Sequence, residues 1–338
     1  MDTIGRLFRV RIYGESHGRE VGVLLEGVPP GIPLGTKDFA DDLERRRGGR
    51  TGTTARREPD IPRLRSGWYR GSTTGRPLLI SFANRQAVSR DYREIRWIPR
   101  PGQADWVAHQ KYHGYQDHRG GGGFSGRLTL GLVAAGVVAK KILGPVEFAS
   151  RVAAVGGRTR TGEIQRVLKE AARKGNSLGG IVHCRINGVP AGLGEPFFDS
   201  VESLISHVLF AIPGVKGVEF GAGFQAAAMT GDEHNDGIEN VEGKTLTNHA
   251  GGINGGITSG NELRVQVGFR PPASISRPQR SIHLKTGKKA QSRVRGRHDT
   301  CFVLRCPVIV ESVVAMVLAD FYLLRRSQLP EGLKSTGN

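Results

Sequence analysis

The sequence of 338 residues predicts an α+β fold made of two similar halves that pack on shared, buried helices. Three features predict it: a strand–turn–helix pattern that occurs twice, a nearly all-apolar helix in each half, and a strand that alternates apolar and polar residues. Such alternation is typical of half-exposed antiparallel strands. The glycine clusters lack G-x-G-x-x-G in the context of a strand, a turn and a helix, and no G-x-x-x-x-G-K-[ST] loop occurs. The sequence therefore argues against a parallel nucleotide-binding sheet.

The repeated pattern consists of a strand, a turn rich in Gly and Pro, and a helix. LEGVPPGIPLG (25–35) leads into TKDFADDLERR, and INGVPAGLGEP (186–196) leads into DSVESLISHVLFAI. Gly and Pro interrupt regular structure, so each turn separates a strand from the helix that follows. In the second copy Asp199 and Glu202 have the spacing of a capping box, which predicts that Asp199 caps the helix.

Each half also contains a helix that is apolar on nearly all sides. These helices are predicted at 128–143 and 307–324, and helices of this composition are normally buried. Both stretches are too short or too interrupted by charges to span a bilayer, so we expect no membrane partner. Strands are predicted at 180–186 and 262–269, and the second of these alternates with a period of two.

The repeat predicts the domain organisation. We expect a single domain over 1–338, with pseudo-halves at about 1–145 and 175–325 that share the central helices. This hypothesis requires residues 25–46 to superpose on 188–209.

The charge and the cysteine content of the sequence limit the classes of ligand and the cellular compartment that we expect. The formal charge is +18, and 37 Arg outnumber 12 Lys. Arginine binds carboxylates and phosphates through two parallel hydrogen bonds, so this excess suits a polyanionic small molecule or a nucleic acid, with a solvated basic surface as the alternative. Three Cys without C-x-x-C spacing argue against a disulfide framework and against a metal site, and they fit a reducing compartment. The N-terminus has no signal-peptide apolar region, so we expect a soluble, cytoplasmic protein.

The stretch GESHG (14–18) places Glu15, Ser16 and His17 between two glycines. A nucleophilic serine needs a base within hydrogen-bond reach, but adjacent side chains in an extended segment point in opposite directions. We therefore interpret His17 as a positioned acid or base, with a structural loop histidine as the alternative.

Further segments carry candidate ligand-binding residues. LERRRGGRTGTTARREPD (43–60) contains six arginines that either close over a polyanion or form a solvated or nucleic-acid-binding patch: Arg45, Arg46, Arg47, Arg50, Arg56 and Arg57. The glycine run in YQDHRGGGGFSGRLT (115–129) enters an apolar helix with Arg127 in its first turn. This is either an anion site or a mobile loop.

Two later segments are similarly open to interpretation. In RGRHDTC (295–301), Arg297 and Asp299 share one face of an extended chain, which suits proton handling beside an anion or a surface ion pair. In TNHAGGINGGITSGNELRV (247–265), four glycines flank Asn254, which suits close approach to a flat ligand or a hairpin turn.

Taken in order along the chain, these segments resemble the chorismate synthase family over nearly the whole length. The matching stretches are FRVRIYGESHG, EGVPPGIPL, RRRGG with RREPD, RPGQADW, QKYHGYQDHRGGGGFSGRLT, GVPAGLGEPFFDSVESLISHVLFAIPGVKGVEFG, NHAGGINGGITSG and GRHDTC. Each stretch alone is modestly specific, whereas the ordered set is very specific.

The resemblance implies a β-α-β sandwich, with central helices between antiparallel sheets, in a homotetramer. It implies a lyase that uses reduced FMN to eliminate phosphate from 5-enolpyruvylshikimate-3-phosphate and form chorismate. This is the last shared step of aromatic amino acid biosynthesis, and the reaction has no net redox change. A polyanionic substrate explains the arginine excess better than a nucleic acid does. Reduction of FMN by NADPH and reduction by an external donor both remain open.

The resemblance also implies residue roles. His17 matches the histidine that protonates the departing phosphate, and Asp299 matches a carboxylate near the flavin N5. Substrate and phosphate groups are expected at Arg46, Arg50, Arg100, Arg127 and Arg297, although the loop around 50–54 is one residue shorter than in some relatives. FMN contacts are expected at Ser125, Arg127, Asn248, His249, Ala250, Arg280 and Arg297.

One departure from the family pattern concerns the chemistry. The sequence has RPGQAD where the family usually has R-P-G-H-A-D, so Gln103 occupies the position of a histidine that contacts reduced FMN. An amide donates a hydrogen bond but does not carry a proton near neutral pH. The alternative hypothesis is therefore a homologue with lost or altered activity. A second departure is the segment 155–177, which is shorter than in relatives and is expected to alter a surface more than the chemistry.

Overall fold

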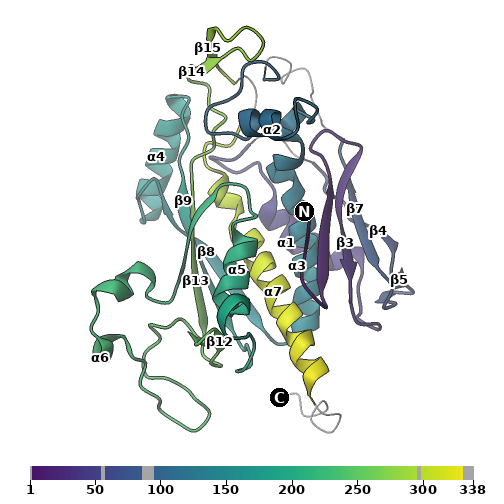
Figure 1. Cartoon of the computed structure of the whole chain (residues 1–338), viewed down its shortest axis with the longest axis vertical. Coiled ribbons are helices and arrows are strands. Elements are labelled where there is room, and N and C mark those ends of the chain that lie inside the picture. Colours follow the sequence, from purple (N-terminus) through teal and green to yellow (C-terminus); the bar gives the residue numbers. More distant parts are fainter. Residues whose placement is uncertain (1, 55–57, 86–94, 295–297, 330–338) are drawn as a thin grey trace.

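Two antiparallel sheets enclose a layer of helices in the computed structural model (Figure 1). The first sheet has the order β1 (Thr3–Ile4), β2 (Arg9–Gly14), β3 (Glu20–Glu26), β7 (Leu78–Ala83) and β4 (Arg63–Ser66). The second has the order β10 (Val215–Phe220), β13 (Leu263–Phe269), β9 (Gly180–Asn187) and β8 (Glu147–Val155). The structure describes residues 2–54, 58–85, 95–294 and 298–329.

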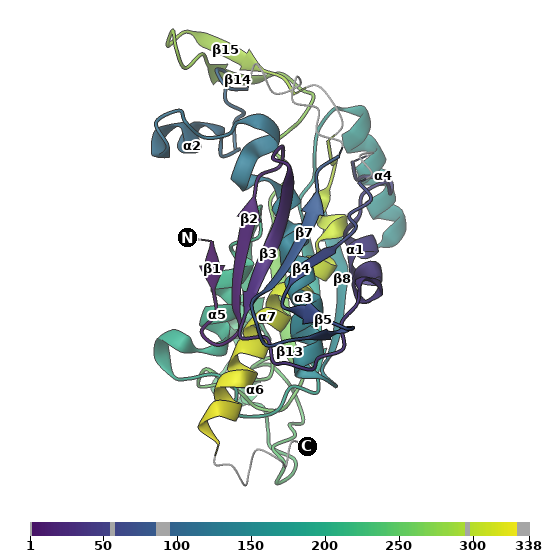
Figure 2. The ribbon, with the colours of Figure 1, turned by 90° about the vertical axis from the view of Figure 1, so that its right-hand side faces the viewer.

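The central layer consists mainly of α3 (Thr129–Leu143) and α7 (Pro307–Gln328), flanked by α1 (Ala40–Arg46) and α5 (Val201–Leu209). Figure 2 shows the first sheet in front of these helices. The remaining elements are α2 (Asp105–Lys111), α4 (Thr161–Arg173), α6 (Gly231–His234) and the hairpins β5 (Trp68–Tyr69)–β6 (Ser72–Thr73), β11 (Ile253–Asn254)–β12 (Ile257–Thr258) and β14 (Gln279–Ile282)–β15 (Lys289–Ser292). The predicted α+β sandwich is confirmed, as are the helices and strands expected in each half.

The two halves have the same topology. Apart from β1, the small hairpins, the 3-10 turns and the helices α2, α4 and α6, the chain order is β2, β3, α1, β4, β7, α3 in the first half and β8, β9, α5, β10, β13, α7 in the second. The spatial orders β2-β3-β7-β4 and β8-β9-β13-β10 correspond strand for strand. This correspondence supports the internal repeat, while the superposition of residues 25–46 on 188–209 stays a prediction.

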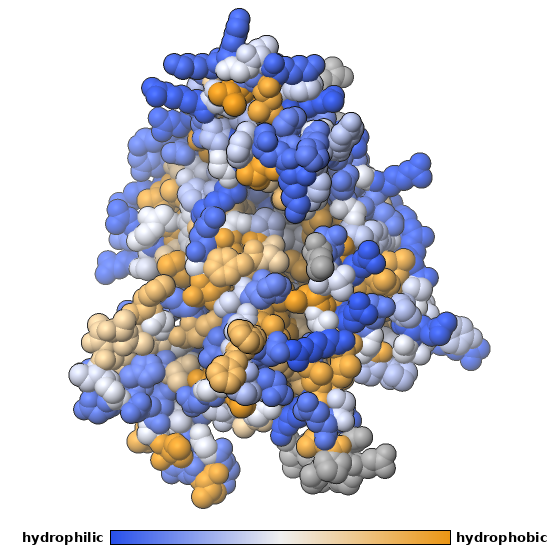
Figure 3. Space-filling view, in the orientation of Figure 1, coloured by the Kyte–Doolittle hydropathy of each residue, from blue (hydrophilic) through white to orange (hydrophobic). Residues whose placement is uncertain are grey.

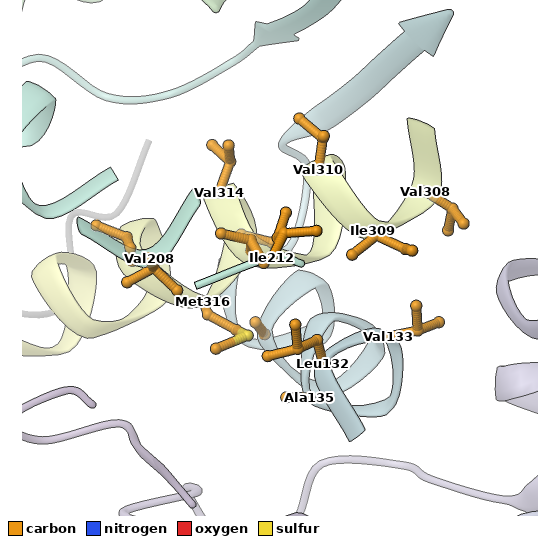
Figure 4. Packing of buried hydrophobic residues seen from close by; sticks show 14 of the residues in the cluster. Leu132, Val133, Ala135, Val208, Ile212, Val308, Ile309, Val310, Val314 and Met316 are labelled. Atoms are coloured by element: carbon orange, nitrogen blue, oxygen red, sulfur yellow. The ribbon is translucent and has the colours of Figure 1, made fainter. Parts of the chain in front are cut away.

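The core lies where α3 packs on α7. A Cβ added to Gly136 of α3 would come 2.3 Å from Cβ of Ser312 in α7, so this glycine permits the close approach of the two helices. Figure 4 shows apolar side chains of both helices and of the α5 region meeting around this contact, among them Leu132, Ile212 and Met316. The near-uniform apolarity of the two sequences thus reflects burial on all sides.

The apolar stretch at 307–324, which Glu311 and Asp320 interrupt, forms a longer helix than predicted. The helix α7 has 22 residues, and by length and composition alone it is apolar enough to cross a bilayer. In the folded chain 78% of its apolar window is buried, so its composition is explained by the protein core.

The buried Glu311 joins the helices to the second sheet. Its carboxylate accepts hydrogen bonds from Arg45 (2.5 and 2.8 Å), from Lys140 (3.2 Å) and from Ser150 (2.5 Å from Oγ). Burial acts to raise the pKa of Glu311, but these hydrogen bonds and cations outweigh it and lower the pKa overall. The network anchors the last turn of α1, in which Arg45 precedes Arg46.

The N-terminal cap of α5 differs from the prediction. Ser200, and not Asp199, is the capping residue, and its Oγ accepts a hydrogen bond from the backbone N of Ser203 (3.0 Å). Asp199 lies in the preceding 3-10 turn and forms an ion pair with Arg6. Two adjacent residues able to cap a helix cannot be distinguished by spacing alone.

Candidate functional site

A cavity of about 540 Å³ opens at the end of the sandwich where both central helices begin. Its wall includes Arg46 at the end of α1, the glycine-rich segment with Arg127 before α3, and the 298–306 segment before α7. Residues 211–214 after α5 and 270–274 after β13 complete it. Segments from both halves therefore build one site.

Arg46 and Arg127 share a buried carboxylate. Asp60 accepts a hydrogen bond from Arg127 Nη1 (2.5 Å) and lies 3.6 Å from Arg46 Nη1, and all three side chains are less than a tenth exposed. Arg46 also donates to Thr129 Oγ1 (2.9 Å) and to the carbonyl of Gly126 (3.0 Å). These bonds fix two guanidinium groups at the cavity wall.

The positive charge of this wall is confined to a poorly solvated space. The pKa of Arg46 is lowered to about 9, mainly by burial and also by the nearby charges of Arg305 and Arg127, while Asp60 and Asp299 oppose the shift. A group with this pKa is still protonated at neutral pH. An anionic ligand would relieve the repulsion among the arginines, so the wall favours anions.

Arg100 provides a third buried guanidinium. Its Nε and Nη2 form a bidentate pair with Asp105 (2.8 and 2.7 Å), and its Nη1 donates to Ser274 Oγ (2.9 Å). The side chain lines the cavity and is 4% exposed. The structure thus brings together Arg46, Arg100 and Arg127, three of the arginines that the resemblance assigns to substrate and phosphate, whereas their role in binding stays a prediction.

Gln103 also lines the cavity, and its contact with Arg270 determines which way its amide group points. Arg270 Nη2 lies 3.2 Å from Gln103 Oε1. Because a guanidinium only donates, the amide oxygen faces Arg270 and the amide NH2 faces away from it. Burial lowers the pKa of Arg270. Gln103 therefore presents an amide NH2 group that donates a hydrogen bond but does not gain or lose a proton near neutral pH.

His17 lies against the glycine-rich wall. A Cβ added to Gly120, which lines the cavity and has a φ of +59°, would come 2.6 Å from His17 Nε2 and 2.6 Å from Ser16 Oγ. His17 is 9% exposed. Glycine at position 120 thus lets the imidazole reach the edge of the cavity.

Asp299 also forms part of the cavity wall. Its carboxylate accepts hydrogen bonds from the backbone N of Thr54 (2.8 Å) and from Arg305 Nη2 (2.8 Å), and it lines the cavity. Ser125 lines it too, and its Oγ accepts a hydrogen bond from the backbone N of Arg127 (3.3 Å). The predicted residues Arg56, Arg57 and Arg297 lie outside the described residues.

Five predicted ligand residues lie away from this cavity. Arg50 is exposed on the turn 50–53, and Arg280 is exposed on the β14–β15 hairpin. Asn248 donates to the carbonyl of Glu262 (2.8 Å), while Asp236 accepts from the backbone N of His249 (2.7 Å) and of Ala250 (2.9 Å). Of the glycines around Asn254, Gly255 and Gly256 form the turn of the β11–β12 hairpin. The folded chain therefore does not bring these residues to the cavity.

Several residues of the site were not predicted from the sequence. Asp60, Asn84, Arg270 and Arg305 each hold a predicted residue, and Pro213 and Gly214 line the wall. Asp60 is the last residue of the RREPD stretch, but the sequence did not indicate which side chains it contacts. The others are single polar or small residues outside the clusters on which the prediction rested.

Comparison with known proteins gives one consistent family. The family model described as chorismate synthase matches residues 8–323. The chorismate synthase of Chitinophaga pinensis is 53% identical over 327 residues, which cover 96% of this chain and 98% of the relative. That of Thermococcus gammatolerans is 44% identical over 347 residues, which cover 95% and 97%.

A solved structure gives the same result for the fold. The structure titled "Crystal Structure of Chorismate Synthase" superposes with a TM-score of 0.73 at 26% identity, covering 95% of this chain and 93% of the other. With the full-length match of the family model and identities well above 30%, these similarities show that the chain belongs to the chorismate synthase family.

Proposed function

We propose that this chain is a lyase that eliminates phosphate from 5-enolpyruvylshikimate-3-phosphate in a trans-1,4 sense and releases chorismate, with reduced FMN as cofactor. The observation that carries the proposal is a cavity between the two halves that three buried guanidinium groups line, with the buried His17 directly behind Gly120 of its wall. The names of the relatives support the same reaction.

The charges of the wall suit this substrate. It carries one phosphate and two carboxylates, and Arg46, Arg100 and Arg127 offer planar donors that bind such groups in pairs. Each of these arginines is already held by Asp60 or Asp105, so its position is fixed before a ligand arrives. Preformed donors of this kind lower the ordering cost of binding.

The remaining wall fits reduced FMN. The volume of about 540 Å³ lies within the range of about 300–1,000 Å³ typical of small-molecule sites. Pro213, Gly214 and Gly123 line the cavity with little side-chain bulk, and Gln103 and Arg270 supply a donor and a cation to the same cavity. When bound, reduced FMN supplies an electron-rich ring to a reaction that has no net redox change.

His17 is the proton donor to the departing phosphate in this proposal. Its ring reaches the cavity edge at Gly120, on the side of the glycine-rich segment that carries Arg127. Proton donation by a positioned histidine typically contributes about 10²–10⁴-fold to a rate. Asp299 accepts hydrogen bonds from Thr54 and Arg305, and in this proposal it is the carboxylate that lies near the flavin.

A second candidate is a homologue with lost or altered activity, and Gln103 is the observation that favours it. The amide is held by Arg270, so it stabilises an acceptor on the ligand but moves no proton. If proton transfer at this wall limits the reaction, the chain is slow or acts on a related substrate. If a hydrogen bond suffices, the chain is fully active.

An anaerobic assay tests both candidates. The protein is mixed with FMN, a chemical reductant and the enolpyruvyl substrate, and phosphate and chorismate are followed in the wild type and in Gln103→His. We expect equal amounts of both products from the wild type. Product from Gln103→His alone would reject the active enzyme and support the altered site, whereas RNA binding without flavin binding would reject both. A parallel reaction with NADPH in place of the reductant tests whether the chain reduces FMN.

We propose a cytoplasmic homotetramer as the working assembly. Large apolar side chains in residues 197–246 are highly exposed in the single chain, including Phe197 (87%), Phe198 (91%) and Phe224 (82%). Figure 3 shows apolar side chains gathered near α5 and α6. Exposed apolar surface of this kind is typical of protein interfaces. Sedimentation velocity measures the assembly, and a monomer at micromolar concentration would contradict this part of the proposal.

A further inference from the structure

We propose that Asn84 is a positioning residue that holds the proton-donor turn and the arginine wall in a fixed relative position. This inference rests on the proposed function and adds to it a residue outside the sequence clusters. Asn84 touches neither the substrate nor the cofactor in this proposal; it acts through His17 and Arg127.

The side chain of Asn84 joins three segments of the chain. Its Nδ2 donates to the carbonyls of Glu15 and Gly18, each at 3.0 Å, and these residues flank His17 in the turn between β2 and β3. Its Oδ1 accepts from Arg127 Nε at 3.0 Å. Asn84 follows β7 directly, and its backbone N donates to the carbonyl of Arg19 (3.0 Å), which continues the pairing of β7 with β3.

These contacts use both chemical functions of the amide. Backbone carbonyls only accept and a guanidinium Nε–H only donates, so the residue at this position must donate on one side and accept on the other. Aspartate keeps the acceptor for Arg127 and loses both donors, whereas leucine, of similar size, loses all three bonds. The two substitutions therefore separate the link to the turn from the link to the arginine.

The connection reaches across the cavity wall. From Asn84 it runs through Arg127 to Asp60 and from there to Arg46, while the other side of the turn is fixed by the hydrogen bond from Ser16 N to the Gly122 carbonyl (3.3 Å). The turn begins at Gly14, whose φ is +91°, and few side chains constrain a glycine-flanked segment. The amide of Asn84 thus sets where His17 lies relative to the charge that binds phosphate.

The test compares Asn84→Leu and Asn84→Asp with the matched variant Asn261→Leu. Asn261 clamps a loop in the same way, because its Nδ2 donates to the Gly243 carbonyl (2.9 Å) and its Oδ1 accepts from Thr245 N (3.2 Å), but it does not line the cavity. Full-length protein is assayed anaerobically for kcat and KM, for the pH dependence of kcat, for thermal unfolding and for affinity toward inorganic phosphate.

Misplacing a reacting group by about 1 Å costs about 10²-fold in rate. We therefore expect kcat to fall by about 10²-fold in both Asn84 variants, with a smaller change in KM and a shifted pH profile, because the contact of His17 matters most in the transition state. Phosphate affinity should also fall in Asn84→Leu, where Arg127 loses its acceptor. Asn261→Leu should keep kcat within about twofold.

The outcomes separate this inference from the proposed function. A wild type that forms no chorismate would reject the function. An active wild type with Asn84 variants within twofold of it would reject the positioning role. A loss of kcat in Asn261→Leu equal to that in the Asn84 variants would also reject the positioning role, because the effect would then come from a general loosening of loops.

Discussion

The buried carboxylate of Asp60 offers the sharpest test of how the cavity is built. Asn is nearly isosteric with Asp, and both tolerate a left-handed backbone, which matters because Asp60 has a φ of +48°. Asp60→Asn therefore removes one negative charge and changes little else. Arg46 and Arg127 are left buried side by side without their shared counter-charge.

The structure sets the size of the effect. Removing one partner of a buried ion pair costs about 3–5 kcal/mol, and all three side chains here are less than a tenth exposed. With an unfolding entropy of about 2.1 cal/mol/K per residue over 338 residues, this loss lowers Tm by about 4–7 °C. The pKa of Arg46, already lowered to about 9 by burial and neighbouring cations, should fall further because Asp60 is a group that raises it.

Thermal unfolding with and without inorganic phosphate measures both consequences. A saturating ligand at 100 times its Kd stabilises a protein by about 2.7 kcal/mol, and phosphate should stabilise Asp60→Asn more than the wild type because it replaces the missing charge. Glu26→Gln serves as the control, because Glu26 pairs with Arg9 at 3.6 Å in an exposed bridge that contributes less than about 1 kcal/mol. An unchanged Tm together with an unchanged gain from phosphate would refute the reasoning.

Three further predictions concern single side chains. Gly120→Ala should abolish most phosphate release and cost about 1–2 kcal/mol in urea unfolding, because the new Cβ meets His17 and the backbone is left-handed; activity near that of the wild type would contradict it. Glu311 has a lowered pKa, so its contribution to stability is present above its ordinary value of 4.5 and is lost as the pH falls through the folded value. Denaturation between pH 3 and 7 should therefore be less acid-dependent in Glu311→Gln, and parallel curves would argue against this. Ser200→Ala should lower the free energy of unfolding by about 1 kcal/mol in chemical denaturation, because a helix cap is lost, and Asp199→Ala should lower it less. A larger loss in Asp199→Ala would instead support Asp199 as the capping residue.

Much of the fold could be predicted because it depends on local patterns. The apolar helices and the two strand–turn–helix units are continuous in sequence, and their periodicity indicates what each element buries. Arg46 and Arg127 could be predicted because arginine clusters beside glycine runs are conspicuous. The Ser200 cap could not, because Asp199 satisfies the same spacing rule.

The parts that could not be predicted depend on contacts between distant residues. Asp60 reaches Arg127, 67 positions away, only because the first sheet and the start of α3 meet. Asn248 and His249 show the same limit. The resemblance implies that they contact FMN, and in the folded chain the carboxylate of Asp236 holds the backbone N of His249, which no local pattern indicates. Their role toward FMN stays a prediction.

The repeated topology explains why the arginine-lined cavity lies where it does. Because the two halves have the same chain order, α3 and α7 both begin at the cavity, and each directs the positive end of its helix dipole toward it (Figure 1). Each helix is preceded by a 3-10 turn with an arginine two residues before the helix starts: Arg127 before Thr129 and Arg305 before Pro307. Each of these arginines is held by a carboxylate, from Asp60 and Asp299 respectively. The glycine-rich segment and residues 298–306, which share little sequence, therefore occupy corresponding positions in the two halves, and the arginine-lined cavity forms where they meet.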